Sequence, residues 1–280
     1  MGKYKTKRKL LLIGRVIVLA FFLLLVILPI YWMLITSLKI PVDINTLDIQ
    51  YWPMHPTLEN YINVLTESNF LYYLKNSVVV SVITGIIVLF VAITGGYGIS
   101  RYKYKGKGIT MLAFLMTQMI PMTLILVPMF LIFHSVNLGD TLTSLIILYV
   151  VINVPFCVIT MQGFFANIPI EVEEAAAIDG CNKFKVITKI VLPVMLPGII
   201  AVFVFAFIGA WNDLLGGVMF INSELKKTLP VGLSSYVGQF AINWGEMCAG
   251  GMLALIPSAL LFVMVQKYIV EGMTSGAVKG

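Results

Sequence analysis

Residues 171–193 read EVEEAAAIDGCNKFKVITKIVLP, and this stretch decides how the whole chain is interpreted. It carries seven of the 32 charged side chains of a sequence that is otherwise largely apolar, so we expect it to lie in water. Glutamates suit the first turn of a helix, and the alanines at 175–177 are the strongest helix formers. Asp179-Gly180 ends that helix, and Asn182 can cap a second one. The sequence therefore predicts two short helices joined by a bend.

The composition places the rest of the chain in a membrane. Of its 280 residues, 59% are hydrophobic and only 11% are charged, and the mean hydropathy is +0.97, whereas soluble proteins carry about 25% charged residues. Apolar runs of this length predict an all-α, polytopic membrane protein with one transmembrane domain over residues 1–280. The six expected spans are 10–35, 76–100, 109–133, 141–165, 192–215 and 247–270, with a loop at 166–191 and a tail at 271–280.

Lysine and arginine are distributed unevenly between the segments that join these spans. If the N-terminus is cytoplasmic, the inner segments hold 15 of the 19 Lys and Arg residues. Such an excess is typical of the cytoplasmic side of a membrane protein. We therefore expect a multi-pass protein with both termini and the 166–191 loop in the cytoplasm. The same distribution accounts for the net charge of +6, so it does not indicate a nucleic-acid partner.

No enzymatic or metal-binding pattern is present in the sequence. The two histidines, His55 and His134, fall in predicted outer loops, and the three cysteines lack metal-ligand spacing. There is no GxxxxGK[ST] motif for nucleotide binding. The centres of spans two, three, four and six hold no charge, which disfavours proton or sodium coupling. These absences favour a transport subunit that is driven by a separate ATPase, and a stand-alone secondary carrier for a small polar solute is the alternative.

The charged stretch also matches a known motif. Glu174-Ala175-Ala176, Gly180 and Ile190–Pro193 stand at the spacing of the EAA loop. In this respect the chain resembles the membrane permease subunits of bacterial ABC importers. IDG at 178–180 and VLP at 191–193 resemble the carbohydrate-uptake branch, in particular the maltose-type permease with six spans. The resemblance extends over roughly residues 76–280 and implies the type I ABC importer permease fold.

The resemblance implies that the EAA loop couples the permease to a cytoplasmic ATPase dimer. Glu174 would be the polar anchor in the ATPase cleft, Ala175 and Ala176 the closely packed face, and Gly180 the bend. The full set of expected coupling residues is Glu174, Ala175, Ala176, Ala177, Asp179, Gly180, Ile190, Leu192 and Pro193. The tail resembles the end of the same subunit type, which implies that Thr274, Gly276 and Lys279 also reach the ATPase.

Two further regions are candidates for the solute and its delivery. Sugars are held by aromatic faces and by amide or carboxylate hydrogen bonds, and the expected pathway residues are Tyr149, Asn153, Trp211, Asn212 and Asp213. For Trp211, a place in the aromatic belt at the membrane interface is an open alternative. The polar loop at 216–246 resembles the family's outer loop, which implies that Asn222, Leu229, Pro230 and Gly232 face an extracellular sugar-binding protein.

The partners implied by the resemblance are a second six-span permease, the ATPase dimer, the binding protein and membrane lipid. The chain itself would bind no cofactor, since ATP and Mg²⁺ belong to the ATPase. Its place would be the bacterial plasma membrane. The residues themselves leave open which sugar is carried and whether the permease pairs with itself.

Overall fold

The computed structural model describes the backbone of residues 2–238 and 241–277 and the side chains of residues 11–238 and 241–268. Within these ranges the structure is helical, and the one β-type pairing is an isolated bridge between Val237 and Ile242. The expected all-α class is confirmed. The chain divides into two compact units: Met1–Ser68 with Leu233–Leu255, and Asn69–Gly232 with Ile256–Gly280.

The first unit is built around the end of the first helix. Its helices are α1 (Gly2–Ser37), α2 (Pro41–Ile44), α3 (Glu59–Thr66) and the beginning of α14 (Trp244–Ala277). The Asn60 side chain in α3 donates hydrogen bonds to the carbonyls of Ser37 and Lys39, at 2.9 and 2.8 Å. A Cβ atom on Gly245 would lie 2.5 Å from the Asn60 amide, so α14 packs closely on α3.

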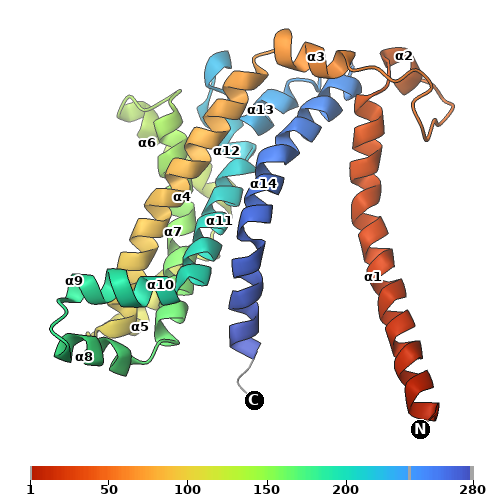
Figure 1. The fold of residues 1–280 in the computed structure, drawn as a ribbon. Coiled ribbons are helices and arrows are strands. Elements are labelled where there is room, and N and C mark those ends of the chain that lie inside the picture. Colours follow the sequence, from red (N-terminus) through yellow and green to blue (C-terminus); the bar gives the residue numbers. More distant parts are fainter. Residues whose placement is uncertain (1, 239–240, 278–280) are drawn as a thin grey trace. The chain divides into compact units, whose positions relative to one another are not determined.

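The second unit holds the candidate site. Its elements are α4 (Phe70–Arg101), α5 (Lys107–Gln118), α6 (Met122–Ser135), α7 (Leu142–Ala166), α8 (Ile170–Ile178), α9 (Lys183–Val186), the π-helical turn η1 (Ile187–Val191), α10 (Leu192–Val194), α11 (Leu196–Trp211), α12 (Leu215–Phe220) and the 3₁₀ turn η2 (Glu224–Lys226). The helix α13 (Leu229–Ser234) begins in this unit. Figure 1 shows α4, α7 and α11 running side by side, and α4 packs mainly on these two neighbours.

Small residues allow α4 and its neighbours to approach one another closely. A Cβ on Gly96 would lie 2.9 Å from the backbone nitrogen of Gln162 in α7. A Cβ on Gly85 would lie 2.7 Å from the ring of Phe203 in α11. Lipid supplies no hydrophobic drive for helix association, so close van der Waals packing at small residues has to hold such helices together.

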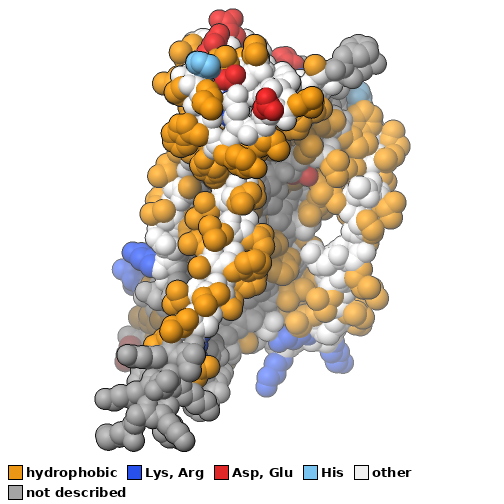
Figure 2. Space-filling view, turned by 90° about the vertical axis from the view of Figure 1, so that its right-hand side faces the viewer, with side chains coloured by type: hydrophobic (Ala, Val, Ile, Leu, Met, Phe, Trp, Pro, Cys, Tyr) orange, Lys and Arg blue, Asp and Glu red, His pale blue; other side chains and the backbone are white. Residues whose placement is uncertain are grey.

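The structure modifies two of the six expected spans. Among the described residues, four helical segments are long and apolar enough to cross a membrane: Leu11–Ser37, Phe70–Arg101, Leu142–Ala166 and Trp244–Tyr268. The segments expected as spans at 109–133 and 192–215 are bent: α5 meets α6 at 95°, and Lys183–Val194 meets α11 at 79°. If each bent pair counts as one span, the total is six. On the face shown in Figure 2, hydrophobic side chains cover much of the helices.

Proline accounts for the position of both bends. Pro121 immediately precedes α6 with an extended ψ of 133°, and Pro197 stands in the first turn of α11. Proline has no N–H to donate and restricts the residue before it, so it begins helices more readily than it continues them. The segment 216–246, which we call the outer loop after its expected side of the membrane, is also more ordered than expected, since it contains α12, η2 and α13.

The close approach of α4 and α7 can be tested at two glycines of the same helix. Gly96→Leu should lower the thermal unfolding midpoint of the purified protein in detergent, because overpacking costs about 1–3 kcal/mol. Gly98→Leu is the matched control, since nothing lies within 4 Å of a Cβ at that position. Both changes gain the same intrinsic helix propensity. Equal midpoints for the two variants would contradict the packing described here.

Candidate functional site

The charged stretch folds as two short helices joined by a bend, as expected. Glu171 and Glu173 occupy the first turn of α8. Gly180 follows the helix with φ of +82°, a left-handed conformation that favours glycine. The Asn182 side chain then accepts a 2.8 Å hydrogen bond from the backbone nitrogen of Lys185 and caps α9. This local architecture is therefore confirmed.

An ion pair that the sequence analysis missed fixes α8 to the end of α4. The Arg101 Nε atom donates to Glu173 Oε1 at 2.6 Å, and the Tyr97 hydroxyl donates to Glu173 Oε2 at 2.8 Å. Arg101 Nη2 also donates to the carbonyl of Ile168 at 3.0 Å. The Arg101 and Glu173 side chains are only 10% and 11% exposed. Opposite charges in two predicted cytoplasmic segments were visible in the sequence, but many such pairings were possible.

The outward side of α8 carries the residues that are free to meet another protein. Glu174, Ala175 and Ala177 are exposed, and Ile178 is 87% exposed. Ala176 is 6% exposed and belongs to the chain's own core. The expectation that Ala175 and Ala176 form one docking face thus needs correction: helical periodicity turns Ala176 inward, and Ala175 and Ala177 are the exposed small residues.

An open groove of about 310 Å³ lies beside α8, between it and the end of α4. Its lining includes Glu174, Ala177 and Lys183. The Lys183 ammonium donates to the Tyr102 hydroxyl at 2.5 Å and lies 4.4 Å from the centre of the Tyr102 ring. The groove therefore has a carboxylate, a small apolar surface and a cation. Of the remaining expected coupling residues, Asp179 and Pro193 are exposed, and Ile190 and Leu192 are half-buried.

Three of the five expected pathway residues meet through hydrogen bonds. The Tyr149 hydroxyl donates to Asp213 Oδ2 at 2.8 Å, and the Asn153 side chain donates to the Tyr149 carbonyl at 2.7 Å. The same Asp213 oxygen accepts from the backbone nitrogens of Gly216 and Gly217, at 2.8 and 3.3 Å. A carboxylate thus holds the start of α12 against α7.

The other two expected pathway residues are placed differently from this cluster. Trp211 is 5% exposed and stacks on Phe207 with ring centres 5.6 Å apart. It is therefore packed inside the helical unit, which disfavours the lipid-facing belt as its location. Asn212 is exposed at the end of α11.

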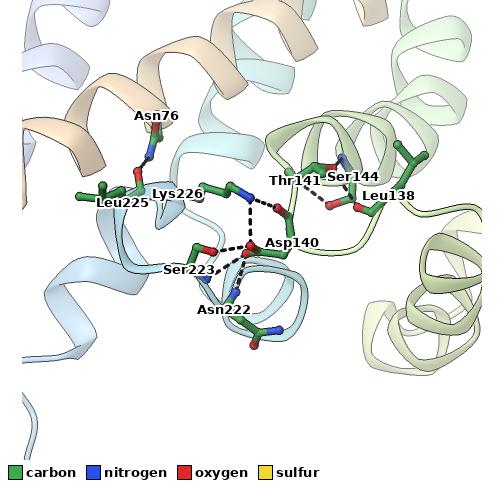
Figure 3. A network of polar contacts seen from close by, with 9 residues as sticks. All are labelled: Asn76, Leu138, Asp140, Thr141, Ser144, Asn222, Ser223, Leu225 and Lys226. Carbon is green, nitrogen blue, oxygen red and sulfur yellow. Dashed lines mark hydrogen bonds and ion pairs between the residues drawn. The ribbon is translucent and has the colours of Figure 1, made fainter.

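A second carboxylate that the sequence analysis did not single out, Asp140, organises the outer loop (Figure 3). Its Oδ1 accepts from the backbone nitrogens of Asn222 and Ser223, each at 2.9 Å. Its Oδ2 accepts from the Ser223 hydroxyl and from the Lys226 ammonium, the latter at 3.0 Å. Asp140 itself has a φ of +53°, so the turn before α7 aims the carboxylate at the loop. Nothing in the sequence HSVNLGD distinguishes this residue from an ordinary turn aspartate.

The first part of the outer loop is also bound to the first turns of α4. The Asn76 side chain donates to the carbonyls of Leu225 and Lys227, both at 2.9 Å. The Tyr73 hydroxyl donates to the Glu224 carboxylate, which also accepts from Lys227 at 2.5 Å. The hydrogen bond from Lys227, and then that from Tyr73, hold the pKa of Glu224 below its ordinary value.

These contacts change which loop residues can face another protein. Leu229 is 1% exposed, and its backbone nitrogen donates to the Ser77 hydroxyl at 2.7 Å. Gly232 is buried, and a Cβ there would lie 2.1 Å from the Tyr73 ring. Of the four expected contact residues, Asn222 is exposed and Pro230 is half-buried. The expected tail contacts lie outside the described residues, since Lys279 is not described and only the backbone of Thr274 and Gly276 is described.

Asp140 should make the stability of the protein depend on pH. Burial alone raises its pKa, but the hydrogen bonds from Ser223, Lys226 and Asn222 outweigh burial and hold the pKa well below its usual range. A depressed pKa stabilises the folded protein above the unfolded value of about 3.9, and this stabilisation is lost as the pH falls. Asp140→Asn should cost about 1–3 kcal/mol at neutral pH.

The measurement is the thermal midpoint in detergent as a function of pH. The gap between wild type and Asp140→Asn should be constant above about pH 5 and should shrink below about pH 4. Asp48→Asn is the control, because within the described part of the chain the exposed Asp48 side chain makes no hydrogen bond or ion pair. A gap that does not change with pH would contradict the role of the charge.

Comparison with known proteins agrees with this architecture. Residues 89–275 match the family described as binding-protein-dependent transport system inner membrane component. The chain is 35% identical over 276 residues to the inner membrane ABC transporter permease protein YcjP of Escherichia coli, covering 98% of this chain and 99% of that protein. It is 33% identical over 253 residues to the diacetylchitobiose uptake system permease protein DasC of Streptomyces coelicolor, covering 90% and 91%.

A solved structure has the same fold. A chain of a bacterial ABC transporter involved in the import of the acidic polysaccharide alginate superposes with a TM-score of 0.80 at 21% identity, covering 92% of this chain and 95% of that one. The expected type I ABC importer permease fold is thereby confirmed. The chain belongs to the family of inner membrane components of binding-protein-dependent transport systems, and it is a multi-pass, non-enzymatic permease subunit of that family.

Proposed function

We propose that this chain is a permease subunit of an ATP-driven importer that translocates a sugar, in particular an oligosaccharide, delivered by an extracellular binding protein. A 33% identical relative is named for the uptake of diacetylchitobiose, a carbohydrate. The Tyr149–Asp213 pair beside Asn153 supplies the hydroxyl, carboxylate and amide groups that suit a polyhydroxylated solute. On this proposal Tyr149, Asn153 and Asp213 lie on the solute's route.

The observation that carries the proposal is the exposed face of α8. Glu174 stands beside the small residues Ala175 and Ala177, and the positive φ of Gly180 turns the chain directly after the helix. A short exposed helix that carries small alanine side chains and the exposed carboxylate of Glu174 suits insertion into a cleft of a partner protein. The energy source is a cytoplasmic ATPase dimer that binds ATP and Mg²⁺, and α8 docks into it.

The assembly contains a second six-span permease, and each permease inserts its own coupling helix into the ATPase dimer. Closure of the dimer on ATP brings the two docked helices together, and the spans rock from inward to outward access. This orientation requires α8 and both termini in the cytoplasm, in agreement with the charge distribution. The outer loop that Asp140 organises then faces the binding protein, and of the residues expected to contact it Asn222 is exposed and Pro230 is half-buried.

The docking role of α8 can be tested with one charge reversal and one backbone change. Glu174→Lys should abolish ATPase binding and sugar uptake while leaving membrane insertion intact, because a reversed charge at an interface brings like charges together, which costs several kcal/mol. Gly180→Pro should do the same, since proline fixes φ near −65° whereas Gly180 has +82°. The measurement is gentle detergent extraction of tagged protein, mass spectrometry of the co-purified proteins, and uptake of labelled sugar.

The matched control is Glu171→Lys, which reverses another exposed glutamate of α8 at the end of the helix away from the bend. It should retain the ATPase. Normal uptake by Glu174→Lys or Gly180→Pro would contradict the docking role. Uptake into vesicles that needs no ATP and that an ionophore abolishes would instead establish a secondary carrier.

A further inference from the structure

We infer that Arg101 and Glu173 are positioning residues that make the coupling helix α8 and the span α4 move as one body. The inference rests on the proposed function, because it concerns how motion of the ATPase enters the membrane helices. On this inference, motion passes from α8 to the membrane helices through a side-chain ion pair at the end of α4, in addition to the covalent connections of α8.

The geometry of the Arg101–Glu173 pair restricts how α8 can move relative to α4. Both carboxylate oxygens of Glu173 have a partner, Arg101 at 2.6 Å and Tyr97 at 2.8 Å. Arg101 bonds Glu173 within α8 and the carbonyl of Ile168 just before α8. One guanidinium thus holds the helix and the residue that leads into it. A charged, directional pair that is nine-tenths buried fixes orientation more strictly than apolar contact does.

The covalent route from α8 to the next span is more compliant. It passes the left-handed Gly180, the π-helical turn η1 and the 79° bend before α11. Each of these interrupts regular α-helical hydrogen bonding. This segment can therefore deform when α8 moves, so that α11 moves less. The ion pair, in contrast, connects α8 to α4 in a single step.

Through α4, a movement of α8 would be passed on to specific neighbouring helices. α4 packs mainly on α7 and α11, so it cannot shift without moving both. Its opposite end holds the outer loop through Tyr73, Asn76 and Ser77. One continuous helix therefore joins the anchor of the coupling helix to the anchor of the loop that faces the binding protein.

The test is a charge exchange in the complete importer reconstituted in lipid vesicles. Arg101→Glu and Glu173→Arg are made singly and together, and each preparation is assayed for bound ATPase and for sugar transported per ATP hydrolysed. The single variants should keep the ATPase, because Glu174, Ala175 and Ala177 are unchanged. Their transport per ATP should fall roughly tenfold or more, within the usual range of coupling between two sites. The double variant should recover most of it.

Two further variants distinguish loss of the ion pair from a general loss of structure. Lys185→Glu makes the same change of charge at an exposed position on α9 and should leave transport per ATP unchanged. Tyr97→Phe removes only the hydroxyl that supports Glu173, so it should fold and still lower transport per ATP by a smaller factor.

The outcomes separate the two levels of the argument. If the single variants and Tyr97→Phe keep the wild-type ratio of transport to ATP hydrolysis, the positioning role is overturned and the proposed function stands. A double variant that folds, binds the ATPase and stays as uncoupled as the single variants would also overturn it. If the wild-type chain retains no ATPase and takes up no sugar, it is the proposed function that fails.

Discussion

The close contact between α4 and its two neighbours is the constraint on which the second unit depends. At Gly96 the helix has no room for a side chain, because the α7 backbone at Gln162 occupies that space. Gly85 plays the same part toward Phe203 of α11. In a membrane, moving apolar surface from lipid to protein gains little free energy. Close van der Waals contact therefore has to favour the packed helix over one that is surrounded by lipid. Arg101 and Tyr149, which make two of the polar contacts of the unit, lie on the helices that this packing holds together.

Sequence reasoning was sufficient where the physical signal is local. The bend at Gly180, the cap at Asn182 and the helical class all follow from propensities and periodicity over a few residues. The membrane character follows from composition. Pro121 and Pro197 were visible as prolines, but whether a proline kinks a span slightly or bends it by 79–95° depends on tertiary contacts, so the size of the two bends could not be predicted.

What the sequence could not supply were contacts between distant segments. Arg101 meets Glu173 across 72 residues, and Asp140 meets Ser223 across 83. Each partner has an unremarkable local context, and opposite charges are abundant in the segments that are predicted to be cytoplasmic. Burial is equally non-local: Ala176, Leu229 and Gly232 look like surface residues in a polar stretch, yet neighbouring helices cover them. The long-range contacts of the candidate site therefore had to come from the structure.

The ordering of the outer loop by Asp140 has a consequence for how the chain is made. The carboxylate is synthesised 83 residues before the Ser223 backbone that it binds. At a synthesis rate of about 5–20 residues per second, roughly 4 to 17 seconds pass before that partner exists. During this interval the turn before α7 exists without the groups that fix it. The hydrogen bonds that join the turn before α7 to this loop can therefore form only after α11 and α12 have been synthesised.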